Sequence, residues 1–149
     1  MVNKRIFTPI QQLGLLKHEF PSSKGSVTRG TMVWRYEFVP SALSDTYKLK
    51  IVYNANKYPK AYIESPKPLQ LAEGAKQLPH TYDYSNGRQQ LCLFWPAADE
   101  WDSSLSIANT IVHWAVQWMY YYEIWLATGT WMGGGHGNCD VIIKESETR

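Results

Sequence analysis

Hydrophobic and polar residues alternate along two stretches in the first half of the chain. Trp34, Tyr36 and Phe38 alternate with charged residues, and the same two-residue period recurs over 47–53. Successive side chains of a strand point to opposite faces, so this period predicts two strands with one buried face each. A third short strand is predicted over 61–64, where two prolines follow and end it. Short connections between consecutive strands favour an antiparallel meander.

A short helix is predicted near the N-terminus. Thr8 fits the N-cap, Pro9 the first helical position and Gln11 the third position of a capping box. The helix is expected to end at Phe20, before a proline, and a polar loop is expected over 22–30. One face of the helix is predicted to be apolar, with Ile10, Leu13 and Leu16.

A longer helix is predicted in the second half. Apolar residues, most of them aromatic, recur at steps of three or four from Ile107 to Trp125, a stripe expected to pack against the sheet. Ser103 or Ser104 fits its N-cap, and Gly129 fits its end. Polar residues interrupt the stripe well short of a membrane span.

The stretch 91–101 leads into this helix and carries the candidate chemistry. It has the pattern of a short apolar strand with one cysteine, Cys92, followed by a proline turn and an acidic pair. The segment 67–90 has little periodicity, which indicates an ordered, irregular loop; its His80 and Asn86 could fold back onto the thiol. A reactive cysteine needs an accessible thiolate, so catalysis requires an exposed sulfur. An inert, buried cysteine is the alternative.

Composition and charge narrow the function classes. The 149 residues suit one domain, and 44% hydrophobic with 19% charged residues is ordinary for a globular protein. The net charge of +2 comes from scattered residues, which gives no concentrated basic face for nucleic acid. The lysines of the strand region are interpreted as its solvated side: Lys48, Lys50, Lys57, Lys60 and Lys67.

The cysteines and histidines indicate neither a disulfide framework nor a metal site. No apolar run of signal-peptide length follows the N-terminus, so a cytoplasmic protein with reduced Cys92 and Cys139 is expected. His136 and Cys139, even with His113, give too few ligands for zinc. We expect no metal and no cofactor.

The order of these features resembles the ubiquitin-conjugating enzyme (UBC) family. That family has a His-Pro-Asn tripeptide before an Asn-Gly turn, an apolar-Cys-Leu active site, and a tryptophan at the head of a helix. Here His80, Asn86, Cys92 and Trp101 follow in the same order with similar gaps. The resemblance covers most of the chain, over about 8–122.

Two departures from the family pattern stand out. The tripeptide is His80-Thr81-Tyr82, so Tyr82 stands where the family has the asparagine that steadies the oxyanion. One Trp/Tyr-rich helix also replaces the family's C-terminal helices. That helix and the segment 40–47 resemble compact bacterial conjugating-enzyme relatives encoded in antiphage CBASS operons, beside a cGAS/DncV-like nucleotidyltransferase.

The resemblance implies an α+β, UBC-like fold in a single domain over 1–149. It would contain an N-terminal helix, a four-stranded antiparallel meander, an active-site loop and a long aromatic-rich C-terminal helix. The core would span about 8–132, and 133–149 would be a flexible tail.

The resemblance also implies an acyl-carrier function in antiphage defence. Cys92 would form a thioester with the C-terminal glycine of a partner, expected to be the nucleotidyltransferase, and pass the acyl group to an amine. A separate activating enzyme would supply the donor thioester if one is needed. His80 would shape the loop, with acid–base work second, and Tyr82 and Asn86 are candidate oxyanion donors.

Two other functions stay open. Without the asparagine, the domain would serve as a non-catalytic binding module. A cysteine hydrolase would use Cys92 with His80 or His113, although no spacing indicates a base held by an orienting group.

Overall fold

The computed structural model describes residues 5–85 and 88–133. In chain order its elements are α1 (Pro9–Glu19), β1 (Lys24–Thr28), β2 (Thr31–Phe38), β3 (Tyr47–Asn54), β4 (Lys60–Ser65), β5 (Thr81–Ser85), β6 (Arg88–Leu91), a short 3₁₀ helix η1 (Pro96–Ala98) and α2 (Ile111–Thr128). The predicted α+β class is confirmed.

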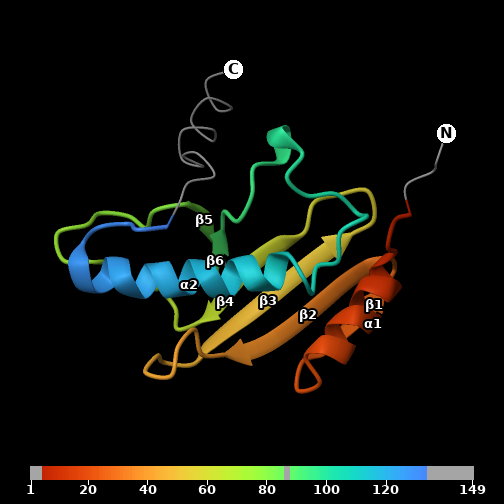
Figure 1. The fold of residues 1–149 in the computed structure, drawn as a ribbon, viewed down its shortest axis with the longest axis horizontal. Helices are drawn as coiled ribbons and strands as arrows, with labels where there is room; N and C mark the ends of the chain where they lie inside the picture. Colours follow the sequence, from red (N-terminus) through yellow and green to blue (C-terminus); the bar gives the residue numbers. More distant parts are fainter. Residues whose placement is uncertain (1–4, 86–87, 134–149) are drawn as a thin grey trace.

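The strands form one antiparallel sheet in the order β1-β2-β3-β4-β6-β5. The predicted antiparallel meander is present as β1 to β4, but it is not the whole sheet, because β6 and β5 extend it to six strands within the described residues. The long helix α2 crosses one face of the sheet, and α1 packs at the β1 edge (Figure 1).

The first additional strand lies in the segment predicted as a polar loop. Lys24 pairs with Arg35 and Thr28 with Thr31, which makes β1 an edge strand. Its polar residues give no hydrophobic alternation, yet the backbone pairs with β2. The turn uses Arg29 and Gly30 with φ of 52° and 78°. Such left-handed two-residue turns match the twist of a hairpin, so the turn explains this strand better than its side chains do.

The second departure is the hairpin β5–β6, which replaces the end of the predicted irregular loop. Thr81 pairs with Leu91, and Gln89, 7% exposed, donates a side-chain hydrogen bond to the Tyr82 carbonyl oxygen at 2.5 Å. The polar side chain of the buried Gln89 is thus paired by a hydrogen bond. This part of the hairpin is held by polar pairing and has no apolar pattern at Gln89 that the sequence would show. The strand ends at Leu91, so Cys92 is the first residue beyond it.

The core lies between the sheet and α2. The predicted stripe is confirmed: Ile107, Ile111, Trp118, Tyr122 and Trp125 are buried, and Trp114 packs against them. On the sheet side the largest fully buried side chains include Trp34, Met32, Leu49, Ile51, Tyr53 and Ile63.

The start of α2 differs from the prediction. The helix begins at Ile111, seven residues after Ser104, and Gly129 ends it in a left-handed conformation, as expected. Ser104 instead hydrogen-bonds the side chain of Asp102 through its backbone N–H and its hydroxyl, which forms a local turn. Such local bonds compete with a helix, so the serines do not start one.

The capping box of α1 is confirmed, and its predicted apolar face is correct for Leu13 and Leu16, which pack in the core, but wrong for Ile10. Thr8 and Gln11 exchange both predicted bonds. Ile10 is 70% exposed, whereas Gln12 is fully buried. The Gln12 amide donates to the Leu105 carbonyl oxygen and accepts from the Ile107 N–H, both at 2.9 Å. This buried amide therefore joins α1 to the segment that precedes α2.

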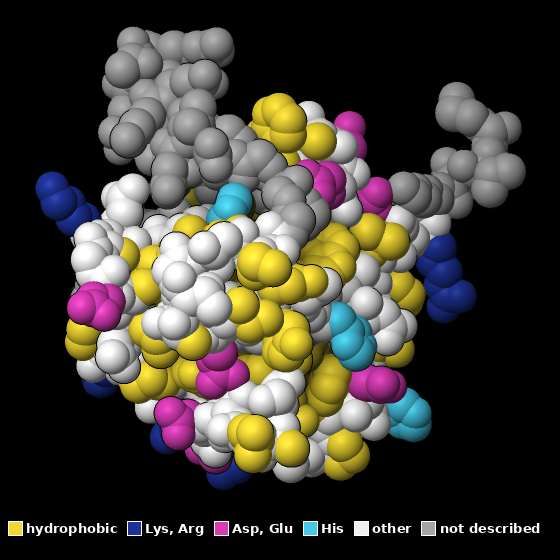
Figure 2. Space-filling view, turned by 60° about the vertical axis from the view of Figure 1, so that its left-hand side comes forward, with side chains coloured by type: hydrophobic (Ala, Val, Ile, Leu, Met, Phe, Trp, Pro, Cys, Tyr) yellow, Lys and Arg dark blue, Asp and Glu magenta, His cyan; other side chains and the backbone are white. Residues whose placement is uncertain are grey.

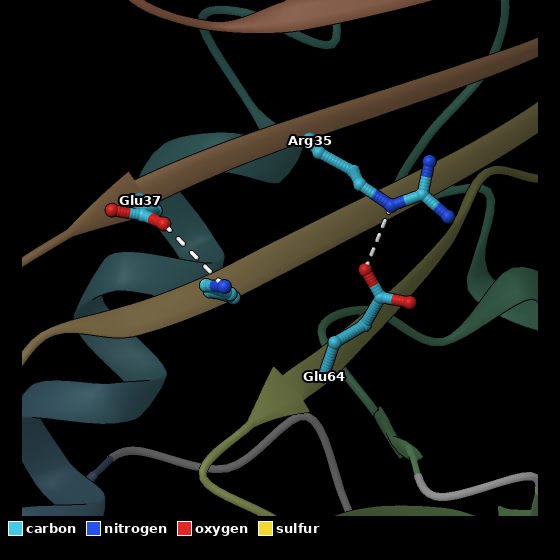
Figure 3. Close-up of polar contacts among 4 residues, drawn as sticks. Arg35, Glu37 and Glu64 are labelled. Carbon is cyan, nitrogen blue, oxygen red and sulfur yellow. Dashed lines mark hydrogen bonds and ion pairs between the residues drawn. The ribbon is translucent and has the colours of Figure 1, made fainter.

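The face of the sheet opposite α2 is polar. In Figure 3, Arg35 and Glu64 point toward each other across the strands, with the helix on the far side, and the Arg35 Nε lies 2.9 Å from the Glu64 carboxylate. Lys48 lies 3.6 Å from Glu37 on the same face. Across the described ranges, no helix has the length and apolar content to cross a membrane.

Candidate functional site

Cys92 is held where the β5–β6 hairpin meets α2. Its backbone N–H donates to the His80 carbonyl oxygen at 3.1 Å, and the Trp118 indole N–H donates to the same oxygen at 3.2 Å. His80 has a φ of 49°, a conformation that non-glycine residues adopt only when the surrounding structure enforces it. One carbonyl oxygen therefore fixes the backbone at Cys92 against the long helix.

The Cys92 sulfur is neither exposed nor a thiol in this structure. Cys92 is 3% exposed, so the sulfur lacks the exposure that catalysis requires. It is also disulfide-bonded, which contradicts the expectation of reduced cysteines. The chain contains one further cysteine, Cys139, which lies outside the described residues. The structure therefore holds an oxidised form of the candidate nucleophile.

Tyr82 of β5 is the candidate oxyanion donor that the structure brings to Cys92. Its hydroxyl lies 3.6 Å from the Cys92 sulfur. A disulfide sulfur has no proton, so the hydroxyl is the donor in this weak contact. Burial raises the pKa of Tyr82 above its usual value of 10.0, which keeps the hydroxyl protonated and able to donate at neutral pH.

The other predicted site residues lie differently. The His80 ring packs against Trp131 at 5.1 Å between centroids, so its side chain contacts an aromatic cluster beside the site. Asn86 lies outside the described residues. His113 is exposed on α2, with its ring 6.4 Å from Phe20, which packs on β2. Three strand spacings, roughly 14 Å, separate β2 from β6, so the geometry does not support a pairing of His113 with Cys92.

The turn after Cys92 is held by local bonds and a buried tryptophan. The Trp95 N–H donates to the Glu100 carboxylate at 3.1 Å, and Asp99 ends η1 with a φ of 52°. Trp101 is 2% exposed, and its indole N–H donates to the Thr110 hydroxyl at 3.0 Å. Trp101 is thus a structural residue that ties this turn to the start of α2.

A groove of about 560 Å³, which we call the β4–β6 groove, lies beside this site. It is formed by β4, β6, the turn between β3 and β4, and the residues that follow Cys92. Tyr82 lines the groove and also contacts the Cys92 sulfur. Three cations and two further tyrosines line it as well: Lys57, Lys60, Arg88, Tyr58 and Tyr62.

Sequence reasoning missed the role of Trp118 and the β4–β6 groove. Trp118 was predicted as a core residue, and it is 5% exposed, but its indole N–H also anchors the site backbone. Lys57 and Lys60 were interpreted as solvated lysines, and they are exposed, yet they gather at one groove. Arg88 of β6 lines the same groove because β6 pairs with β4, and no residue pattern carries that pairing.

The described part of the chain contains no group of three or more His, Cys, Asp or Glu side chains that could hold a metal. His136 and Cys139 lie outside it. The expectation of no metal site therefore stays a prediction.

The comparisons with known proteins identify the family. The model of the family described as "Type II CBASS E2 protein" matches residues 12–138, which include the whole sheet, the candidate site and α2. No curated protein matches the chain. The family description places the chain in CBASS antiphage defence with an E2-like role, E2 being the usual term for a ubiquitin-conjugating enzyme. The chain belongs to the Type II CBASS E2 protein family.

Proposed function

We propose that this protein is a ubiquitin-conjugating-enzyme-like acyl carrier that uses Cys92 to form a thioester with a partner's C-terminal glycine. The position of Cys92 carries the proposal: it directly follows β6, its backbone is fixed by His80, and its sulfur contacts a tyrosine that lines a groove. Family membership supports the E2-like class. The partner proposed is a cGAS/DncV-like nucleotidyltransferase of the same operon.

The chemistry consists of two acyl transfers. The Cys92 thiolate attacks the carbonyl carbon of the thioester that joins the donor to an activating enzyme, the new thioester forms, and the cysteine thiolate of the activating enzyme leaves. An amine then attacks the Cys92 thioester, an amide bond forms, and the Cys92 sulfur leaves and takes up the proton that the amine loses. Covalent catalysis divides one difficult transfer into two easier ones.

Two changes must precede the first transfer. Disulfide exchange with a cellular dithiol releases Cys92 as a thiol, and the dithiol is oxidised to its own disulfide. The Tyr82 side chain must then move enough to admit a carbonyl carbon, since Cys92 is 3% exposed. After that movement the Tyr82 hydroxyl is a suitable donor for the oxyanion of the tetrahedral intermediate.

The experiment that tests the proposal uses reduction as its variable. The protein is treated with a phosphine, which reduces disulfides without attacking thioesters, and is mixed with the nucleotidyltransferase, with and without the activating enzyme and ATP. We expect an adduct on a non-reducing gel that a thiol reagent dissolves. Protein that was not reduced should give none. Absence of the adduct from reduced, folded protein in every mixture would contradict the proposal.

Replacing Tyr82 with phenylalanine tests the oxyanion role. Tyr82→Phe keeps the ring but removes the donor, so we expect thioester formation to slow by about tenfold or more. The measurement is the single-turnover rate of adduct formation by reduced protein. Tyr58→Phe is the matched control, because Tyr58 lines the same groove and its hydroxyl lies 3.4 Å from the Pro96 carbonyl oxygen. Equal rates for the two variants would remove Tyr82 from the mechanism.

A non-catalytic binding module is the second candidate, and the burial and oxidation of Cys92 favour it. In that case the disulfide has a structural role, and partner binding does not need a thiol. The binding module predicts that Cys92→Ala leaves partner binding and phage protection unchanged, whereas the acyl carrier predicts that protection is lost.

A further inference from the structure

The β4–β6 groove is cationic and aromatic. Among the described residues that line it, none is acidic, while Lys57, Lys60 and Arg88 supply three positive charges. Cations are distributed differently elsewhere: on the molecular face shown in Figure 2, Lys and Arg lie only at the rim of the view. On the neighbouring part of the sheet, Arg35 and Lys48 each lie beside a carboxylate. The described residues that line the groove therefore carry three positive charges and no negative one.

Arg88 shows that the groove is suited to an acceptor-rich ligand. Its guanidinium carbon lies over the Tyr62 ring, 4.3 Å from the centroid, and Tyr62 lines the same groove. Its Nε is buried and has no hydrogen-bond partner within the described ranges. Buried donors are normally paired, so an unpaired N–H in a groove wall is a site where a ligand oxygen can bind.

We propose that the β4–β6 groove binds the acidic, extended segment that precedes the C-terminal glycine of the acyl donor. The inference rests on the proposed acyl-carrier function, because Tyr82 connects the groove to the Cys92 sulfur. The terminal carboxyl becomes the acyl group, so the anionic groups that the cations bind must be side chains upstream of it. The charge also excludes the acceptor amine from this groove, since a protonated lysine is repelled by three cations.

The strand spacing sets the position of the acidic side chains. Arg88 is the first residue of β6, and Cys92 directly follows the end of that strand. Four residues of extended backbone therefore separate them by about 13 Å. An extended tail covers that distance with about four residues, so the acidic residues are expected around the fourth position before the terminal glycine. A peptide fits better than nucleic acid, because three cations are few beside the phosphate contacts of nucleic-acid proteins.

The test measures binding without chemistry, in a Cys92→Ser protein. The probe is a fluorescein-labelled decapeptide of serines that ends in glycine, with glutamates around the fourth position from the end; a second peptide has glutamines there. By fluorescence anisotropy at low salt we expect the glutamate peptide to bind at least about fivefold more tightly. The double variant Lys60→Glu/Arg88→Glu should abolish that preference, and rising salt should weaken it.

A charge-matched control separates the groove from net charge. Lys17→Glu/Lys24→Glu makes the same charge change at exposed positions near the opposite edge of the sheet, and it should leave binding unchanged. Equal binding of the two peptides, or displacement of the glutamate peptide by oligothymidine at equal charge concentration, would overturn the inference. Binding of the peptide by a protein that forms no thioester would uphold the groove and contradict only the acyl transfer.

Discussion

Reduced protein with Cys92 replaced by alanine is expected to form no adduct with its partner, a loss on the order of 100-fold or more in rate. The reason is chemical, since the acyl group then has no sulfur to which it can transfer. Phage protection should be lost as well. The measurements are adduct formation on a non-reducing gel and plaque formation on cells that carry the operon.

Cys139→Ala is the matched control for this variant. It also removes one cysteine, but it leaves the sulfur of Cys92 as the single thiol of the chain. We expect this variant to form the adduct without prior reduction. If Cys92→Ala and Cys139→Ala protected cells equally well, the binding module would be the better account of the protein.

Gln12→Leu is expected to lower the free energy of unfolding by about 2–4 kcal/mol. Gln12 is fully buried and satisfies both the Leu105 carbonyl oxygen and the Ile107 N–H at 2.9 Å. Leucine fills a similar volume but leaves both backbone groups without a partner. Equilibrium unfolding in urea, followed by tryptophan fluorescence, measures the change.

The control for this prediction is Gln117→Leu, on the exposed side of α2. That variant should change the free energy of unfolding by less than about 0.5 kcal/mol. Similar losses in both variants would show that glutamine itself, and not its buried bonds, accounts for the effect.

The periodic elements were predictable and the polar ones were not. The alternation around Trp34 and the aromatic stripe of α2 each bury a continuous apolar face, so their patterns identified them. The strand β1 lacks such a pattern, and a hairpin turn with backbone pairing places it at the edge of the sheet. In β5 the alternation of Tyr82 and Tyr84 with polar residues spans only five residues, within the segment predicted as a loop. The burial of Gln12 was not predicted, because its side chain is stabilised by two hydrogen bonds to backbone groups of a segment far away in the sequence.

The candidate site shows the same division. Cys92, His80 and Tyr82 were selected by order in the sequence, and the fold brings the Tyr82 hydroxyl to the sulfur while the His80 carbonyl holds the Cys92 backbone. The sequence left the exposure of Cys92 open, since exposure depends on how Tyr82 and α2 pack, and the oxidation of Cys92 was not expected. A lone cysteine in an apolar stretch carries no sequence signal for either property.

Intact-protein mass spectrometry of the phosphine-reduced protein, mixed with its nucleotidyltransferase and the activating enzyme with ATP, tests the central claim most directly. The acyl-carrier account predicts a species with the summed mass of the two chains minus one water. Neutral hydroxylamine should remove it, and digestion should map it to Cys92. A reduced, folded protein whose mass never changes in that mixture would contradict the account.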